Sequence, residues 1–456
     1  MRRRKNTPIC DFVRAYAKKR PLRLHMPGHK GRGALGVEAQ DITEITGADV
    51  LYHGSGIIAQ SQANATRLFR SAKTVYSTEG SSLSIRAALL LLKQYATEQN
   101  RAPQILAARN AHKSFMNAAA LLDLPVAWVA SEAGSLLSFS LSLAEWERAI
   151  YRHAPLAVYI TSPDYLGKMA DVAGLADLCH KCGCLLIVDN AHGAYLRLSP
   201  QRMHPLECFA DIVVDSAHKT LPVLTGGGYL HIGHNAPAFF AERAEAAMAF
   251  FASTSPSYLI LQSLDAANAY IDGMGRRDFA VIAALVEECK EKLTSGGYTV
   301  LESEPWKITL LPKSYGYTGD ALAAYLEERS IIPEFADKDY LVLMPSAQTT
   351  AREMKKLTAA LLSLPKREPI TEAPPALSAP SPVLSLKAAV FAKTERLPVE
   401  AAVGRILASA SVSCPPAVPI LIAGERIDEG AVALCRYYGV DSVLVVIEKR
   451  LSPHGE

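Results

Sequence analysis

Between about residues 75 and 235, short apolar runs alternate with segments whose apolar positions recur at helical spacing. The runs PLAVYIT, CLLIVD and ADIVVD predict strands, and the segment ADVAGLADLCHKCG predicts a helix that ends at Gly183. These strands are apolar almost throughout, which is typical of a mostly parallel sheet covered by helices on both faces. The pattern therefore predicts an α/β domain with its ligand site beyond the carboxyl ends of the strands.

The pattern changes further along the chain and predicts several successive parts. Strand-like YTVLES, WKITLLP and YLVLMP alternate with helix-like ALAAYLEERS and TAREMKKLTAALLSL, whereas KREPITEAPPALSAPSP is too rich in proline and alanine to build a core. The predicted parts are an N-terminal arm with helices (1–75), a large domain (76–289), a small α+β domain (290–364), a linker (365–383) and a C-terminal α+β domain (384–456).

The composition is that of a globular enzyme with two or three domains. The chain has 456 residues, of which 49% are apolar and 20% are charged. A net charge of +3 is small for this length, so nucleic acid is not expected as a partner.

Targeting signals are not expected. The basic N-terminal MRRRKNTPIC precedes no apolar core of a signal peptide, and the longest apolar stretch, which ends before Lys93, is too short to cross a membrane. These features predict a cytoplasmic protein without membrane contact.

Three of the eight cysteines lie close together as Cys179, Cys182 and Cys184, with His180 between them. Cys-x-x-Cys is the spacing of zinc ligands, but no second Cys/His pair lies at a suitable distance. We therefore interpret the three as structural thiols in a reducing compartment and predict no metal site.

Two features ahead of the predicted strands indicate binding of a phosphate and of a flat ring. Gly80, Ser81 and Ser82 form a small-residue turn that opens into a strong helical pattern, and such a helix start binds anions. His112 begins another helical pattern in ARNAHKSFMNAA, where its imidazole can stack on a heteroaromatic ring. Each feature also has an ordinary explanation as a helix cap.

Two further features follow predicted strands. Asp189 ends CLLIVD, and a buried carboxylate there needs a cationic or proton-sharing partner, such as a pyridine nitrogen, an arginine or a metal. Lys219 follows ADIVVD, with Ser216 and His218 beside it, and a desolvated lysine forms Schiff bases. Together the four features describe a planar ring with a phosphate, a basic nitrogen and an aldehyde, which is pyridoxal 5′-phosphate (PLP).

A set of longer motifs extends this pattern over about residues 20–445. They are LRLHMPGHKGR, DITEITGADVLYHGSGIIAQSQ, EGSSLS, RNAHKS, TSPDYLG, VDNAHGAY, DSAHKTLPVLTGGGYLH, STSPSYLILQSLD, PVEAAVGRI and PPAVPILIAGERI. In these motifs the chain resembles the Orn/Lys/Arg decarboxylase family, in the short form without an N-terminal receiver-like domain. The resemblance implies fold type I, in which a large domain with a mostly parallel seven-stranded sheet is joined by small and C-terminal α+β domains.

The resemblance also implies a role for each site residue. Lys219 would bind PLP as a Schiff base, Asp189 would pair with the pyridine nitrogen, and His112 would stack on the ring opposite Ala191. The phosphate would be held by Ser81, Ser82, Ser216 and His218, and by Ser253 and Thr254 of a neighbouring subunit, which implies a homodimer. The predicted catalytic residues are Lys219, His218, His112 and Asp189; the predicted cofactor-binding residues are Gly80, Ser81, Ser82, His112, Asp189, Ala191, His192, Ser216, His218, Lys219, Ser253 and Thr254.

The implied reaction is decarboxylation of a basic L-amino acid to an amine and CO₂, in polyamine-related metabolism. Arginine is favoured over lysine and ornithine, because short-form members are often arginine decarboxylases. Glu425 is the candidate for the distal cation of the substrate, and His29 and Asp164 are expected near the substrate. The chain departs from the family pattern at Asn190, where an acidic residue is common, and at Asp164-Tyr165, where Thr-Tyr is common.

Two other functions remain open from the residues alone. An aminotransferase of the same fold usually holds the substrate carboxylate with an arginine late in the small domain, but YLVLMPSAQTT has none before Arg352. A PLP-binding homologue without activity is disfavoured by the presence of Lys219, Asp189 and His112.

Overall fold

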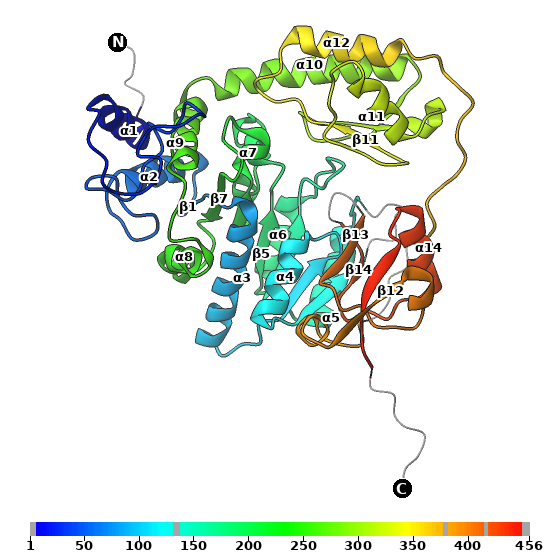
Figure 1. Cartoon of the computed structure of the whole chain (residues 1–456). Helices are drawn as coiled ribbons and strands as arrows, with labels where there is room; N and C mark the ends of the chain where they lie inside the picture. The colour runs from blue at the N-terminus through cyan, green and yellow to red at the C-terminus, as the bar shows by residue number, and fades with distance from the viewer. Residues whose placement is uncertain (1–5, 131–136, 377–381, 415–417, 449–456) are drawn as a thin grey trace.

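The structure is a computed structural model that describes residues 6–130, 137–376, 382–414 and 418–448. Its centre is a seven-stranded sheet with the order β1-β7-β6-β5-β4-β2-β3 (Figure 1). Strand β7 is antiparallel to its neighbours β1 and β6, and the other pairs in this sheet are parallel. The α/β class and the mostly parallel seven-stranded sheet predicted from the sequence are thereby confirmed. The strands are β1 (Lys73–Ser77), β2 (Ile105–Ala108), β3 (Val126–Val129), β4 (Ala157–Thr161), β5 (Leu185–Asp189), β6 (Ile212–Asp215) and β7 (Gly228–Ile232).

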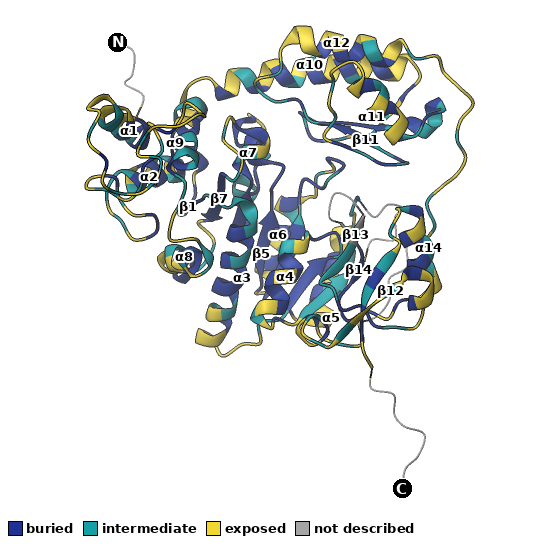
Figure 2. Ribbon diagram, viewed as in Figure 1, coloured by how far each residue is buried: buried dark blue, intermediate teal, exposed yellow. Residues whose placement is uncertain are grey.

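Helices cover both faces of this sheet, as the apolar strands require. In β4, Ala157 and Tyr159 pack in one core cluster, and the alternate residues Val158 and Ile160 pack in another on the opposite face. The first face is covered by α3 (Gly80–Glu98), α4 (Lys113–Leu122) and α8 (Ala238–Phe251), and the second by α5 (Leu143–His153) and α6 (Val172–Lys181). In Figure 2 most of the sheet is dark blue, and many of the exposed residues lie on the outer sides of the helices.

The N-terminal helices α1 (Pro8–Lys18) and α2 (Ile57–Phe69) pack with α9 (Tyr258–Gly273) beside β1. The buried carboxylate of Asp265 joins them: it accepts from the Cys10 amide at 3.0 Å and from the Ser61 hydroxyl at 2.6 Å. Helix α10 (Gly275–Ser295) then runs towards a second sheet (Figure 1). The N-terminal segment is therefore anchored to α9 through Asp265 and to the large sheet through α2, which packs on β1.

The second sheet is antiparallel, with the order β10-β11-β9-β8. Helix α12 packs on α10, and α11 packs on β11. These elements are β8 (Thr299–Val300), β9 (Ile308–Leu311), β10 (Phe335–Ala336), β11 (Leu341–Leu343), α11 (Gly319–Glu327) and α12 (Ala351–Leu362).

The C-terminal elements form two antiparallel strand pairs, β12 with β15 and β13 with β14. Helix α13 and strand β14 contact α4, so this part packs against the large sheet's own helices (Figure 1). The elements are α13 (Leu386–Val390), β12 (Thr394–Pro398), β13 (Ser411–Cys414), β14 (Val418–Ile422), α14 (Glu429–Tyr437) and β15 (Ser442–Val446). Single 3₁₀ turns occur at Ala194–Leu198, Pro205–Cys208, Pro312–Tyr315 and Val399–Ala402.

The structure also bears on the clustered cysteines and on the apolar segments of the chain. Cys179 and Cys184 are buried in the core between the sheet and α6, as expected of structural thiols. Among the described residues, no helix is both long and apolar enough to cross a membrane.

Candidate active site

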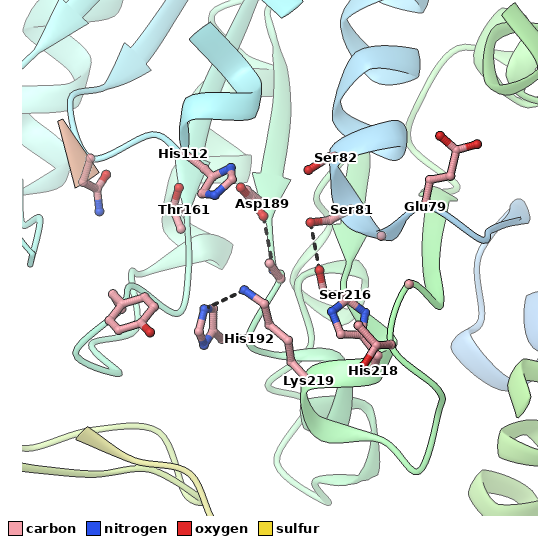
Figure 3. A pocket seen from close by; sticks show the side chains of 16 residues that line it. Glu79, Ser81, Ser82, His112, Thr161, Asp189, His192, Ser216, His218 and Lys219 are labelled. Carbon is pink, nitrogen blue, oxygen red and sulfur yellow. Dashed lines mark hydrogen bonds between the residues drawn. The ribbon is translucent and has the colours of Figure 1, made fainter. Parts of the chain in front are cut away.

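A cavity of about 380 Å³ lies at the carboxyl ends of β4, β5 and β6, beside the first turn of α3 (Figure 3). Its position is the one expected for ligands of a parallel sheet. All the predicted cofactor-binding residues except Ser253 and Thr254 line it. The lining residues are Glu79, Gly80, Ser81, Ser82, Asn110, His112, Thr161, Tyr165, Asp189, Ala191, His192, Ser216, His218, Lys219, Thr225 and Gly226.

Lys219 lies on the one-turn helix α7 (Ala217–Thr220), directly after β6. Its Nζ lies 3.0 Å from Nε2 of His192 (Figure 3). Burial lowers the pKa of Lys219 below its ordinary value, and the carboxylate of Asp189 opposes this change. Because an amine attacks an aldehyde only in its neutral form, these surroundings favour the nucleophilic state of Lys219.

Asp189 ends β5 and is buried at the base of the cavity. Its Oδ2 accepts from the hydroxyl of Tyr159 at 3.1 Å, and its Oδ1 accepts from the amide of Ala191 at 3.2 Å. Burial raises the pKa of Asp189, whereas the charge of Lys219 and the two hydrogen bonds oppose the rise. A cation placed against this carboxylate would be bound strongly, because little water competes for it.

The opposite end of the cavity is suited to an anion. Helix α3 begins at Gly80, which has a φ of +68°, so a larger residue there would be strained. The hydroxyl of Ser216 donates to that of Ser81 at 2.8 Å, and the hydroxyls of Ser82 and Ser114 lie 2.8 Å apart. The positive end of a long helix and a group of hydroxyls are the usual partners of a phosphate.

His218 is held in one orientation by the backbone. Its Nδ1 donates to the carbonyl of Gly227 at 2.8 Å, because a carbonyl oxygen can only accept. Burial lowers the pKa of His218, and the bond to Gly227 opposes the change. The neutral ring therefore carries its lone pair on Nε2, where it can take up a proton.

His112 precedes α4 and caps it. Its Nδ1 accepts from the amide of Ser114 at 3.2 Å, which leaves the ring fixed at the cavity wall. Burial lowers the pKa of His112 to about 4, and the charges of Lys219 and Lys113 act in the same direction. The ring is therefore neutral at physiological pH, as suits stacking on a cationic heterocycle.

We expect His112 to remain neutral between pH 8 and about pH 5 in the cofactor-free protein. Because the unfolded chain binds this proton near pH 6.5 and the folded chain only near pH 4, the stability associated with His112 is present above pH 6.5 and falls as the pH drops towards 4. NMR titration of the ¹⁵N-labelled imidazole measures this, with His112→Gln to assign the signal. A midpoint at 6 or above would contradict it.

Three predicted residues lie outside the cavity with their expected roles untested. Ser253 and Thr254 are exposed after α8, and the amide of Ser253 donates to Glu79 at 2.8 Å, next to the cavity. Nε2 of His29 lies 3.2 Å from a carboxylate oxygen of Asp41. The contact of Ser253 and Thr254 with a neighbouring subunit, and that of His29 with the substrate, stay predictions.

The structure corrects the position predicted for Asp164. Its side chain is buried, accepts from the amides of Lys168 at 2.9 Å and Phe139 at 3.3 Å, and does not line the cavity. The carboxylate therefore shapes the loop after β4, and the adjacent Tyr165 is the residue that reaches the cavity.

The structure also corrects the position predicted for Glu425. This buried side chain forms a bidentate ion pair with Arg109, in which Nη2 donates to Oε2 at 2.8 Å, and it accepts from the amide of Ile422 at 2.8 Å. Glu425 therefore attaches the C-terminal part to the large sheet of its own chain, and it does not line the cavity.

We expect Glu425→Gln to destabilise the protein by about 3 kcal/mol, because the largely buried Arg109 would be left without a counter-charge. The midpoint of denaturant unfolding measures the change, with the exposed Glu429→Gln on α14 as the control. A higher KM with unchanged stability would instead restore the substrate role.

Several residues that line the cavity were not predicted from the sequence. Thr161 ends β4, and Asn110 follows β2; the rule that selected Asp189, polar residues after buried strands, would have found both. Thr161 Oγ1 and Asn110 Oδ1 are buried and have no hydrogen-bond partner within the described chain. Such atoms at a cavity wall are suited to bind a ligand.

A buried polar network beneath the cavity explains the unusual Asn190. Asp215 accepts from Nε2 of His204 and of His231, each at 3.1 Å, and from Nδ2 of Asn190 at 2.7 Å. Burial by itself would raise the pKa of Asp215, but the two histidines lower it below its usual range. The anion accepts these three hydrogen bonds, so an amide at Asn190 suits it better than a second carboxylate. The side chains of His204, Asp215 and His231 also have the spacing of a metal site, but both imidazoles are already hydrogen-bonded to the Asp215 carboxylate.

These residues fit PLP. The cavity holds a buried carboxylate for a pyridine nitrogen, a lysine of lowered pKa for an aldehyde, and a helix start with hydroxyls for a phosphate. The unpartnered oxygens of Thr161 and Asn110 offer further hydrogen bonds. The fold and this site define a PLP-dependent enzyme of fold type I.

Comparison with known proteins identifies the family. Residues 7–313 match the major domain of Orn/Lys/Arg decarboxylases, and residues 372–442 match their C-terminal domain. The chain belongs to the Orn/Lys/Arg decarboxylase family and is an amino acid decarboxylase.

Similar proteins cover nearly the whole chain. An arginine decarboxylase of Halalkalibacterium halodurans is 28% identical, over 96% of this chain and 94% of its own. An arginine decarboxylase of Bacillus subtilis is 26% identical, over 93% and 91%. Among solved structures, the Francisella novicida lysine decarboxylase aligns with a TM-score of 0.79 at 18% identity, over 97% of this chain and 81% of its own.

Proposed function

We propose that the protein decarboxylates L-arginine to agmatine and CO₂, as part of polyamine-related metabolism. The observation that carries the decarboxylase function is the placement of Lys219 and Asp189 in one cavity at the ends of adjacent strands. Full-length similarity to arginine decarboxylases favours arginine over lysine and ornithine.

The chain's residues divide the chemistry between the two ends of the cavity. When bound, PLP supplies an electron sink for the electron pair left by the departing CO₂. Lys219 is the amine that holds the cofactor covalently, and Asp189 holds a proton on its pyridine nitrogen. Ser81, Ser82 and Ser216 bind the phosphate, and His112 orients the ring.

Protonation of the substrate Cα has two candidates. Lys219 has its Nζ inside the cavity, and His218 presents Nε2 as the nitrogen that can take up and return a proton. Burial of the surrounding residues also removes water from the substrate carboxylate, which favours the loss of CO₂.

The decisive experiment is a substrate panel with product identification. The purified protein with PLP is incubated with arginine, lysine and ornithine, and CO₂ and the amine product are measured. Agmatine with stoichiometric CO₂ supports the proposal, and cadaverine or putrescine would reassign the substrate. A keto acid without CO₂ would indicate an aminotransferase, and cofactor binding without any product would indicate an inactive homologue.

We further propose that the protein is a cytoplasmic homodimer whose active site lies at the subunit interface. The N-terminal segment carries strongly exposed apolar side chains, Leu22 at 83%, Leu24 at 84% and Leu35 at 83%. Such a surface is typical of a covered interface. The cysteines whose side chains are described are free thiols, which agrees with a reducing compartment. Light scattering on the eluting protein tests the dimer, and a monomeric mass would refute it.

A further inference from the structure

Two lysines approach the same imidazole from opposite sides. Nε2 of His192 lies 3.0 Å from Nζ of Lys219, and its Nδ1 lies 3.4 Å from Nζ of Lys307. Figure 3 shows the first of these contacts. Lys307 directly precedes β9 of the second sheet and is 1% exposed. His192 therefore links the second sheet to the lysine of the active site.

The other partners of Lys307 require it to donate. Its Nζ lies 2.9 Å from Oε1 of Glu304, 3.3 Å from the carbonyl of Tyr165 and 3.4 Å from that of Asp164. Carboxylate and carbonyl oxygens only accept, and an ammonium has three N–H donors and no lone pair. Burial raises the pKa of Glu304, and the ammonium of Lys307 opposes this rise. Four acceptor atoms surround the three N–H groups of Lys307, so one N–H is shared between two of them; towards Nδ1 of His192, Lys307 can act only as a donor.

A neutral imidazole has a single acceptor nitrogen. Burial lowers the pKa of His192 well below its ordinary value, and the nearby ammonium of Lys307 acts in the same direction, so the ring is neutral. If Nδ1 accepts from Lys307, then Nε2 carries the proton and points it at Nζ of Lys219. Lys219 can accept that proton only as a free amine. A charged Lys219 would place two hydrogens against each other over 3.0 Å.

We propose that Lys307 is a positioning residue: by donating to Nδ1 of His192, it keeps the ring proton on Nε2 and thereby keeps Lys219 as the free amine. The inference rests on the proposed role of Lys219 in holding PLP. It gives the second sheet a direct part in preparing the active site, because Lys307 and Glu304 both lie in the loop that joins β8 to β9.

The test must distinguish the effect of the His192 ring proton on Lys219 from the direct effect of nearby charges on Lys219. Lys219 faces the carboxylates of Asp189, Glu334 and Glu304 and the ammonium of Lys307. His192 faces both lysines and, in addition, His112 and His218. Replacing Lys307 alone would change the local charge, so the test variant is Lys307→Met combined with Glu304→Gln, which removes one positive and one negative group.

The readout is the reactivity of Lys219 in the cofactor-free full chain. Acetylation by acetic anhydride is followed by peptide mass spectrometry from pH 6 to 11, with the exposed Lys181 as the internal standard. We expect the double variant to raise the midpoint of the pH dependence of Lys219 acetylation by about one pH unit. This shift lowers the labelling of Lys219 near neutral pH about tenfold. In a His192→Phe background the same double substitution should add no further shift. An unchanged midpoint, or an equal rise without His192, would overturn the proposal.

A second measurement needs no substitution at Lys307. In the wild-type chain, ¹⁵N NMR of the histidines reports the protonated ring nitrogen, and His192 is the signal lost in His192→Phe. We expect protonation at Nε2, and protonation at Nδ1 would overturn the proposal even if the double variant does not fold. Both measurements are made without cofactor or substrate. Failure of the substrate panel would therefore refute the proposed function without affecting this inference.

Discussion

Replacement of Lys219 by alanine is expected to lower the rate of CO₂ release by about 10³-fold or more. The variant should also lose the visible absorbance of lysine-linked PLP, because no other amine in the described chain lines the cavity. The reason is geometric: Lys219 lines the cavity, and its Nζ lies beside His192.

The measurement combines absorbance spectra of the purified protein with a CO₂ assay. Lys181→Ala is the matched control, because Lys181 ends α6 on the surface and its side chain is 71% exposed. Full absorbance and activity in the Lys219 variant would show that another group holds the cofactor, and the assignment of this site would fail.

Asp189→Asn is expected to lower kcat by about 10²–10³-fold, the size of effect found when a single buried electrostatic partner is removed. The amide keeps the shape of the side chain and can still accept from Tyr159, but it has no negative charge with which to hold a proton on the pyridine nitrogen. PLP should still be attached through Lys219.

Steady-state kinetics and the cofactor content of the purified variant separate these two effects. Asp171→Asn is a suitable control, because Asp171 caps α6 at the surface and asparagine caps helices equally well. Loss of cofactor with unchanged kcat for the remaining holoenzyme would show that Asp189 serves binding rather than catalysis.

The prediction of the fold class succeeded because its signals are local. Each strand is a short apolar run, and in a parallel sheet the residues that follow such runs meet at one edge. Thr161, Asp189 and Ser216 thus come together at the cavity, although they are distant in the sequence. Gly80 and His112 could be placed at helix starts by the same local reasoning.

Two of the substrate-side predictions, those for Asp164 and Glu425, did not match the structure, and the reason is physical. A carboxylate in a motif can bind a ligand or a residue of its own chain, and the motif is the same in both cases. Glu425 pairs with Arg109, which is 316 positions away, and Asp164 binds the amides of its own loop. These partners follow from packing between distant parts of the chain.

The sequence by itself determined the fold class, the family and the order of the residues predicted to bind the cofactor, because periodicity and motifs are properties of neighbouring residues. The tertiary structure alone decided which charges are paired. It placed His204 and His231 against Asp215, Glu425 against Arg109, and Lys307 against His192. Hydrogen bonding and desolvation depend on the whole surroundings of a group, and they set the protonation states on which the chemistry of Lys219 depends.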